Sequence, residues 1–197
     1  MILNALEMAL MNNPLRAAVQ RGYEGRVLER LGGQMNGGVA LEVGCGRGVG
    51  AGIILDRFAA DRVEAFDLDP RMVELARARM ADRGDRVRFW VGDAESIQAA
   101  DATYEAVFEF GILHHVPDWR AALLEIRRVT KPGGTLYAED VYAALISWKW
   151  SRKLLEHPDE GLFDHAGFTR AISGSSFEIL NETSLLGLFG FVAARAV

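Results

Sequence analysis

The sequence predicts an α/β fold: a mainly parallel sheet of seven strands, the last antiparallel, with helices on both faces. Three observations support this. Short runs of strand-forming apolar residues alternate with segments whose apolar residues recur at helical spacing. Such alternation requires crossover connections and therefore favours parallel strands. A glycine-rich stretch also joins the first strand to its helix, and 197 residues suffice for one substantial domain.

The first 37 residues are expected to form a helical cap. Ile2, Leu6 and Leu10 stand four residues apart, and the apolar pattern continues to Leu31. The stretch Asn12-Asn13-Pro14 should divide this region into two helices, because proline interrupts a helix. We expect these helices to cover the core. A substrate lid and a helix at a membrane surface are the alternatives.

The central feature is the junction LEVGCGRGVGAG over residues 41–52. Strand-type residues precede Gly44, Gly46, Gly48 and Gly50, which occupy every second position, and an apolar helical segment follows. Glycine allows unusual backbone dihedrals and a close ligand approach. The helix after such a turn directs free N–H groups back toward it. The junction therefore predicts a ligand site.

The remaining elements follow from the same patterns. Strands are expected over residues 62–68, 87–91 and 104–110, from 135 onward, and over 177–181 and 188–194; helices are expected over 71–81, 117–129 and 163–172, with a helix and loop over 143–160. A short connection joins the last two strands, which should therefore be antiparallel. Glu42, Asp67 and Asp93 fall in or just after the first three strands. Ligands of open parallel sheets bind at the carboxyl ends of the strands.

Composition narrows the class of function. The formal net charge of -5 argues against a broad nucleic-acid-binding surface. The only cysteine, Cys45, cannot form an intramolecular disulfide, so an intracellular, cytoplasmic location is expected. No charge-free apolar run approaches the roughly 18 residues of a membrane span. We expect a small-molecule acceptor and no nucleic-acid partner, in a monomer or homodimer, and weak contact with a membrane surface stays open.

The glycines match two ligand-binding patterns. Gly46, Gly48 and Ala51 fit the dinucleotide pattern G-x-G-x-x-G/A, but the first strand would then have to end two residues later. Glu42, Gly44, Gly46 and Gly48 complete the pattern E/D-x-G-x-G-x-G. A carboxylate at the end of the second strand, such as Asp67, suits the two hydroxyls of a ribose. The ligand is therefore expected to contain adenosine.

Several motifs in this order resemble the class I S-adenosylmethionine-dependent methyltransferases, in particular the small single-domain, type 11-like group similar to ubiquinone and menaquinone biosynthesis methyltransferases. They are LEVGCGRG, AFDLDPRMVELAR, VGDAESI, YEAVFEFGILHHVPDWRAALLEIRRVTKPGG and TLYAED. The resemblance covers roughly residues 38–140. It implies a Rossmann-like fold and one methyltransferase domain over residues 1–197, with a cap (1–37), a cofactor-binding core (38–140) and a lid followed by the final strands (141–197).

The resemblance also implies a cofactor, S-adenosyl-L-methionine, and residues that bind it. The methionine end would be held by Glu42 and by the turn residues Gly44, Cys45, Gly46 and Gly48. Asp67 would bind the ribose hydroxyls, and Leu68 would pack on the adenine. Asp93 would accept a hydrogen bond from the adenine amino group, helped by the backbone of Ala94. Phe110 would line the methionine arm.

No catalytic residue can be assigned from the sequence, and three candidates remain. His115 and His114 could remove a proton from an acceptor hydroxyl, because histidine titrates near neutral pH. Glu109 stands where the family commonly has a small or neutral residue. The histidines show no metal-ligand spacing, so no metal is expected. The motif [DNS]-P-P-[YFW], typical of enzymes that methylate base amines or glutamine, is replaced after the fourth strand by EFGI.

The expected reaction is direct transfer of a methyl group to a small organic acceptor. Trp148 and Trp150 are expected to pack along a helix or lie at the surface, with an apolar wall of the substrate site as the alternative. Nearby Tyr142, Phe163 and Phe168 favour an apolar or aromatic acceptor. His157 and His165 are expected at the surface or in loops, with a substrate contact as the alternative. Because the cofactor carries a good leaving group, the protein mainly aligns the reactants and excludes water. A nicotinamide-dependent oxidoreductase and a non-catalytic cofactor-binding protein are the two alternatives.

Overall fold

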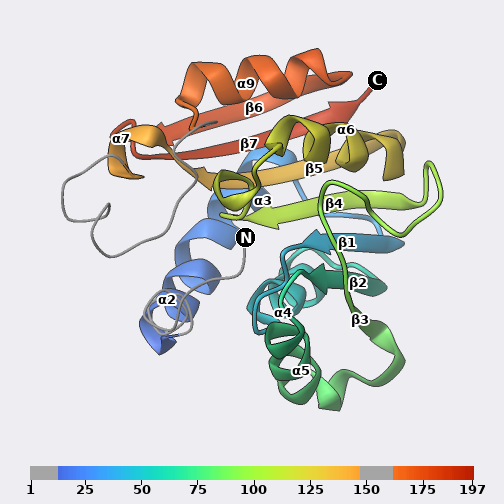
Figure 1. Cartoon of the computed structure of the whole chain (residues 1–197). Coiled ribbons are helices and arrows are strands. Elements are labelled where there is room, and N and C mark those ends of the chain that lie inside the picture. The colour runs from blue at the N-terminus through green and yellow to red at the C-terminus, as the bar shows by residue number, and fades with distance from the viewer. Residues whose placement is uncertain (1–12, 147–161) are drawn as a thin grey trace.

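The computed structural model describes residues 13–146 and 162–197 (Figure 1). Seven strands form one sheet in the order β3-β2-β1-β4-β5-β7-β6. The expectations for residues 1–12 and for Trp148, Trp150 and His157 lie outside the described residues. The strands are β1 (Val39–Val43), β2 (Arg62–Asp67), β3 (Val87–Val91), β4 (Tyr104–Phe110), β5 (Thr130–Val141), β6 (Phe177–Leu185) and β7 (Phe189–Ala196).

The predicted direction of the strands is confirmed. β1 pairs in parallel with β2 and β4, β2 with β3, and β4 with β5. β7 is antiparallel to both of its neighbours, β5 and β6, so six strands point one way and the last points the other. The carboxyl ends of β1, β2 and β4 therefore meet at one edge of the sheet, where the chain leaves each strand for a loop.

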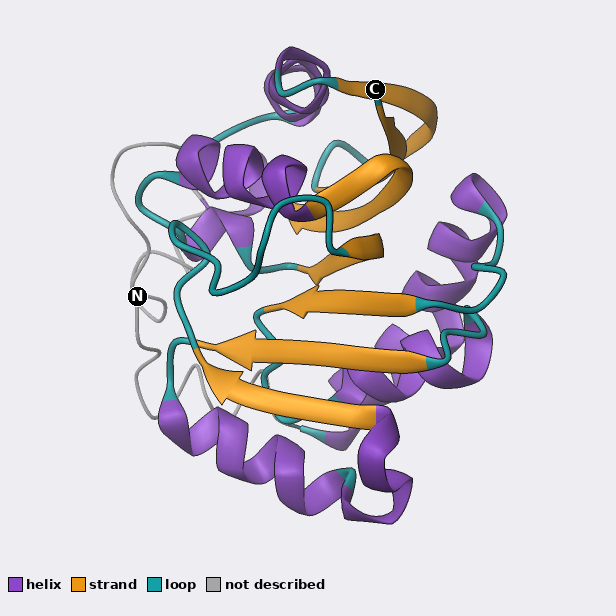
Figure 2. Ribbon diagram, turned by 90° about the vertical axis from the view of Figure 1, so that its right-hand side faces the viewer, coloured by secondary structure: helices purple, strands orange, loops and turns teal. Residues whose placement is uncertain are grey.

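Helices cover both faces of this sheet, as the sequence predicts (Figure 2). Residues of α3, α4 and α5 pack in one apolar cluster, represented by Leu28, Ile54 and Val73. Residues of α6 and α9 pack in the other, represented by Leu123 and Phe168. The helical elements are α2 (Pro14–Val19), η1 (Gln20–Glu24), α3 (Gly25–Gly32), α4 (Val49–Arg57), α5 (Pro70–Arg79), η2 (Ala81–Arg86), η3 (Leu113–His115), α6 (Trp119–Val129), α7 (Ala143–Ile146) and α9 (His165–Gly174).

The predicted break before Pro14 is the start of α2. The side chain of Asn13 accepts a hydrogen bond of 2.8 Å from the backbone N–H of Arg16, and Pro14 occupies the first helical turn. The helix continues through η1, which has π-helical geometry that the sequence did not reveal. Such segments often mark functional positions. Among the described helices, none is both long and apolar enough to cross a membrane.

The fifth strand starts earlier than expected. Thr130 pairs with Tyr104, and the next pairing joins Thr135 to Ala106, so four residues, 131–134, oppose a single residue of β4. Gly133 has a φ of 79° within this irregular stretch. Thr130, the C-cap of α6, is therefore also the first residue of β5.

Candidate functional site

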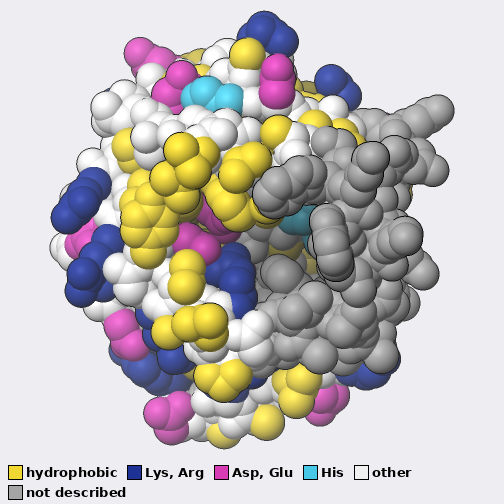
Figure 3. All heavy atoms as spheres, turned by 90° about the vertical axis from the view of Figure 1, so that its left-hand side faces the viewer, with side chains coloured by type: hydrophobic (Ala, Val, Ile, Leu, Met, Phe, Trp, Pro, Cys, Tyr) yellow, Lys and Arg dark blue, Asp and Glu magenta, His cyan; other side chains and the backbone are white. Residues whose placement is uncertain are grey.

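A cavity of about 370 Å³ lies at the carboxyl edge of the sheet. Figure 3 looks onto this side of the molecule, where hydrophobic, acidic and basic side chains border a hollow. Most of the predicted site residues line the cavity: Glu42, Gly44, Cys45, Gly46, Asp67, Leu68, Asp93, Ala94, Phe110 and His115. Gly48, Glu109 and His114 are not part of its wall.

The glycine turn needs its glycines. Gly44, Gly46 and Gly48 have φ values of 73°, 47° and 81°, in the region that other residues rarely adopt. Gly48 precedes α4 and donates a hydrogen bond of 2.8 Å to the carbonyl of Cys45, so it shapes the turn behind the cavity wall. β1 ends at Val43, as the E-x-G-x-G-x-G pattern requires.

Glu42 carries a buried carboxylate with unused acceptor capacity. The backbone N–H of Ala51 hydrogen-bonds to the carboxyl group, whereas Oε2 is buried and has no hydrogen-bond partner among the described residues. Burial, and next the negative charge of Asp67, raise the pKa of Glu42 well above its usual range. A buried acceptor without a donor is costly. A ligand with an N–H donor, above all a cationic one, would satisfy it.

Asp67 connects β2 to the glycine turn. Its Oδ2 accepts a hydrogen bond of 2.8 Å from the N–H of Gly46, and its Oδ1 accepts one of 2.9 Å from the N–H of Asp69. Burial is the main cause that raises the pKa of Asp67. A carboxylate offers about four lone-pair positions, so two backbone donors leave room for hydroxyl donors from the cavity.

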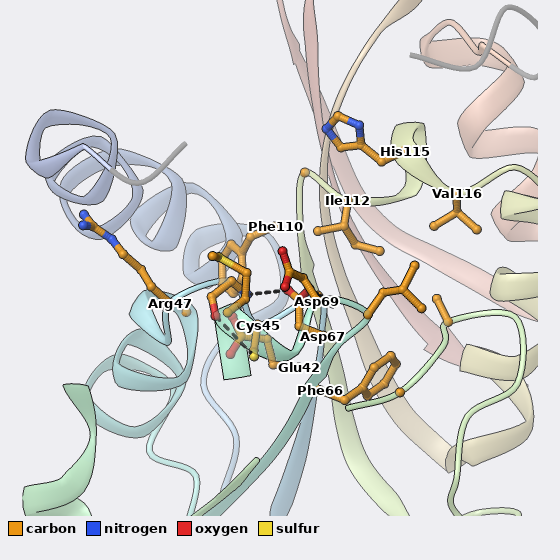
Figure 4. Close-up of a pocket in the computed structure, with 18 of the residues that line it drawn as sticks. Glu42, Cys45, Arg47, Phe66, Asp67, Asp69, Phe110, Ile112, His115 and Val116 are labelled. Carbon is orange, nitrogen blue, oxygen red and sulfur yellow. Dashed lines mark hydrogen bonds between the residues drawn. The ribbon is translucent and has the colours of Figure 1, made fainter. Parts of the chain in front are cut away.

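The far end of the cavity suits a flat apolar group. Leu68 lines it and remains 41% exposed, which is unusual for a leucine beside a buried strand end. Ala94 and Asp93 line the same region, and Oδ1 of Asp93 accepts a hydrogen bond of 3.0 Å from the N–H of Glu95. In Figure 4, Glu42, Asp67 and Phe110 lie close together, while His115 and Val116 stand apart from them.

Three residues before β1 line the cavity and were not predicted from the sequence. Arg16 and Ala17 belong to α2, and Gln20 is the first residue of η1. Nη1 of Arg16 donates to both carboxylate oxygens of Glu24, at 2.7 and 2.6 Å. Its Nη2 lies 3.6 Å from Oε2 of Glu139, beyond hydrogen-bond distance. The Nε and Nη2 groups of Arg16 therefore keep donors for a ligand. No local motif could have placed this arginine at the site.

A contact to the glycine turn positions α2 over the cavity. Nη2 of Arg47 donates a hydrogen bond of 3.0 Å to the carbonyl oxygen of Asn13, the residue that caps the helix. Arg16, Gln20 and Glu24 stand four residues apart, which brings them to one side of the helical run. α2 and η1 thus form one wall of the site.

The two adjacent histidines differ in their surroundings. His115 is partly buried and lines the cavity, whereas His114 is buried outside its wall. Nδ1 of His114 pairs with Oδ1 of Asp140, and its backbone N–H donates to Oδ2 of Asp140 at 3.2 Å. The ring centroids of the histidines are 4.0 Å apart. His165 lies elsewhere, with Nδ1 2.7 Å from Oη of Tyr142.

Glu109 shapes the turn after β4. Its Oε2 accepts hydrogen bonds from the N–H groups of Gly111 and Ile112, at 3.1 and 3.2 Å. Burial, followed by the charges of Asp140 and Glu139, raises the pKa of Glu109 well above its usual range. The Glu109 carboxyl group thus serves as the acceptor for two backbone N–H groups of this turn. Within residues 13–146 and 162–197, no cluster of side chains could hold a metal ion.

Comparison with known proteins gives a consistent identification. Residues 40–134 match the family described as methyltransferase domain. The malonyl-[acyl-carrier protein] O-methyltransferase of Serratia marcescens is 33% identical over 135 residues, which are 68% of this chain and 50% of that protein. A ubiquinone biosynthesis O-methyltransferase of Vibrio cholerae is 29% identical over 151 residues, 73% of this chain and 60% of that protein. The chain thus spans about half the length of the curated relatives it matches.

Solved structures share the whole fold. A Haloferax volcanii methyltransferase, determined in complex with the Trm112 methyltransferase activator, aligns with a TM-score of 0.81 at 18% identity and covers 100% of this chain and 99% of that one. A methyltransferase of Bacillus halodurans aligns with a TM-score of 0.73 at 18% identity, over 88% and 99% of the two chains. Sequence match and fold together identify residues 40–134 as a methyltransferase domain of the class I, S-adenosylmethionine-dependent, type 11-like kind.

Proposed function

We propose that this chain transfers a methyl group from S-adenosylmethionine to a small organic acceptor of apolar or aromatic character. The unpartnered, buried Oε2 of Glu42 is the observation that carries the proposal. It lies beside a glycine turn and a carboxylate with spare lone pairs, in a cavity that also holds an exposed leucine. The ammonium of the cofactor would bind to Glu42, its ribose hydroxyls would bind to Asp67, and its adenine ring would lie against Leu68.

Each residue then has a definite task. Glu42 would accept a hydrogen bond from the ammonium at the methionine end of the cofactor. The free donors of Arg16 would bind the carboxylate at that same end. Asp67 would accept from the ribose hydroxyls, and Leu68, Asp93 and Ala94 would hold the adenine. The wall residues Phe110 and Ile112 would exclude water from the reacting atoms. The bound cofactor supplies an electrophilic methyl group on a sulfonium.

We assign the removal of a proton from the acceptor to His115, because His115 lines the cavity and His114 does not. His114, held by Asp140, would support the position of its neighbour. We expect His115→Ala to lower turnover of a hydroxyl acceptor by about 10²-fold or more, the usual contribution of a general base. The affinity for the cofactor product should stay unchanged, and an equal loss of both would remove His115 from this role.

The relatives agree on the reaction class and differ in acceptor. By name they include a malonyl-[acyl-carrier protein] O-methyltransferase, a fatty-acid O-methyltransferase, a ubiquinone biosynthesis O-methyltransferase and a phosphoethanolamine N-methyltransferase. Three of these four are O-methyltransferases. This range supports methyl transfer and leaves the acceptor of this chain to experiment.

Calorimetric titration tests the proposal directly. S-adenosylhomocysteine and NAD would be titrated separately into the full chain and into Asp67→Ala. We expect binding of S-adenosylhomocysteine alone, weakened by the substitution. Binding of NAD alone would instead refute the proposal and favour the oxidoreductase alternative. Product formation from a panel of phenols and fatty acids then separates an enzyme from a non-catalytic binding protein.

A further inference from the structure

A second cavity, of about 490 Å³, lies among η1, α3, α4 and the end of α5. It shares no wall residue with the cavity at the carboxyl edge. Buried Ile53 and Met80 line it together with Gly52, and the rest of its wall is charged or polar. Its volume lies in the range of small-molecule sites. The proposed function gives this second cavity no role.

The carboxylates of the second cavity are all engaged by two of its arginines. Glu29 pairs with Arg57 at 2.8 Å. Asp56 accepts two hydrogen bonds from Arg83, at 2.7 and 2.8 Å, and Oδ2 of Asp82 lies 3.9 Å from Nε of the same arginine. The other two arginines of the wall therefore have no carboxylate of this cavity as a partner.

These two arginines are Arg21 of η1 and Arg79, the last residue of α5, and both are exposed. A third, Arg47, follows Gly46 in the glycine turn, and Figure 4 shows its guanidinium directed away from Glu42 and Asp67. Burial, and next the positive charges of Arg79 and Arg21, lower the pKa of Arg47. In the part of the chain that the structure describes, none of the three pairs with a carboxylate. Three elements thus bring uncompensated positive charge to one place.

This gathering of like charges opposes folding unless an anion offsets it. The chain has 27 aspartates and glutamates against 22 lysines and arginines, so carboxylates are in excess, yet none neutralises this group. A guanidinium is suited to bind two oxygens of a carboxylate or a phosphate. A phosphate group suits two separate arginines better, because it carries about two negative charges and three acceptor oxygens.

We propose that the second cavity binds a phosphate-bearing small molecule, whose phosphate group accepts hydrogen bonds from Arg21 and Arg79. The charge of Arg47 would add to the attraction from the side of the glycine turn. The organic part of the ligand would lie against Ile53 and Met80. Because this cavity is separate from the one at the carboxyl edge, the ligand would be an effector and not the methyl acceptor.

Such a ligand would also act on the cavity at the carboxyl edge. Arg21 directly follows Gln20, and α5 carries Met72; Gln20 and Met72 both line that cavity. A phosphate held between Arg21 and Arg79 would join these two walls. The phosphate ligand and the cofactor should therefore each raise the affinity for the other, because linked binding is reciprocal. Only this coupling rests on the proposed function.

Calorimetric titration of the full chain with pyrophosphate tests the site. The ionic strength would be held constant with sodium chloride, so that general screening does not change. We expect saturable binding by the wild type. Arg21→Gln and Arg79→Gln should each weaken it about tenfold, the usual loss of one hydrogen bond to a charged group. Pyrophosphate should also raise the thermal unfolding temperature of the wild type more than that of either variant.

Both variants should fold, because neither arginine has a partner to lose among the described residues. Without pyrophosphate they should be at least as stable as the wild type, since each substitution removes like-charge repulsion. Arg26→Gln is the matched control. Arg26 is also exposed and belongs to the next helix, α3, but it is not part of the cavity wall, so this variant should bind pyrophosphate as the wild type does.

Three results would overturn the proposal: no saturable binding by the wild type, unchanged binding by Arg79→Gln, or an equal loss in Arg26→Gln, which would indicate diffuse attraction to positive charge. Titration with S-adenosylhomocysteine, with and without pyrophosphate, tests the coupling separately. We expect its affinity to rise about fivefold or more with pyrophosphate. An unchanged affinity would refute the coupling. No binding of S-adenosylhomocysteine under either condition would refute the proposed function, while the phosphate site would stand on its own titration.

Discussion

The carboxylate of Asp67 accepts a hydrogen bond of 2.8 Å from the backbone N–H of Gly46. This contact ties the end of β2 to the turn after β1, so two separate strands shape one end of the cavity. It also means that Asp67 contributes to stability as well as to ligand binding, because two backbone donors depend on it. The two contributions can be separated by experiment.

Asp67→Ala should lower both the affinity for S-adenosylhomocysteine and the free energy of unfolding. Loss of the acceptor leaves the N–H groups of Gly46 and Asp69 without partners, at about 1–3 kcal/mol. Loss of the ribose contact should weaken binding by about tenfold or more. Calorimetry and urea denaturation measure the two effects.

Asp61→Ala is the matched control. Oδ2 of Asp61 accepts a hydrogen bond of 2.7 Å from the N–H of Gly38 at the opposite edge of the sheet. This variant should lose stability and keep its affinity for S-adenosylhomocysteine. If Asp61→Ala weakened binding as much as Asp67→Ala, the ribose contact would not be the cause.

Two glycines of α4 should respond oppositely to alanine. A Cβ added at Gly50 would overlap Oε1 of Glu42 and lie 2.9 Å from the ring of Phe110, so Gly50→Ala should displace the buried carboxylate and abolish cofactor binding. A Cβ at Gly52 would find its nearest atoms at 3.9 Å, in ordinary contact with Met80. Gly52→Ala should therefore stabilise the helix by about 0.5–1 kcal/mol. Thermal unfolding and calorimetry would show the contrast, and unchanged binding by Gly50→Ala would contradict the assigned place of Glu42.

Stability should fall as the pH rises from about 5 to 8. Burial raises the pKa values of Glu42, Glu109 and Glu139 well above their usual range. When the pKa of a carboxyl group is higher in the folded than in the unfolded protein, the group contributes to the free energy of unfolding. This contribution is complete only below the unfolded pKa, which is about 4.3 for glutamate. This contribution is lost as the pH rises through the folded pKa. Carboxyl groups with lowered pKa values, such as those of Glu105 and Glu125, have the opposite effect and make stability rise with pH. They titrate at lower pH, so they do not offset the expected loss of stability.

Glu109→Gln tests this pH dependence at one site. A glutamine oxygen can still accept from the N–H groups of Gly111 and Ile112, so the turn should persist. Urea denaturation at several pH values should then show a smaller loss of stability on going from about pH 5 to 8 than the wild type shows. Parallel curves for the two proteins would mean that Glu109 does not ionise in this range.

Arg16→Gln should lower the affinity only for ligands that carry the amino-acid portion of the cofactor. If the free donors of Arg16 bind the methionine carboxylate, the variant should bind S-adenosylhomocysteine about tenfold more weakly, the usual loss of one hydrogen bond to a charged group. Binding of 5′-methylthioadenosine, which lacks the amino-acid portion, should not change. Equal weakening of both ligands would indicate that the substitution disturbs α2 as a whole, and no effect on either would place Arg16 outside the cofactor site.

Much of the site could be predicted because it is encoded locally. The E-x-G-x-G-x-G spacing places Glu42 and the turn glycines within one short stretch, and chain geometry alone brings them together. Asp67 and Asp93 follow neighbouring parallel strands, so they also arrive at the same edge. For these residues, recognising each strand was enough to predict their position.

The remaining features depend on packing between distant segments. Arg16 reaches the cavity because Arg47 contacts the carbonyl of Asn13 and because η1 turns Glu24 inward. Glu109 and Phe110 are adjacent in β4, yet only Phe110 lines the cavity, since successive side chains of a strand point to opposite faces. The sequence by itself determined the order of strands and helices along the chain, the glycine turn and its acidic neighbours. Only the tertiary structure decided which helix closes the cavity and which histidine faces it, because these depend on contacts between residues that lie far apart in the chain.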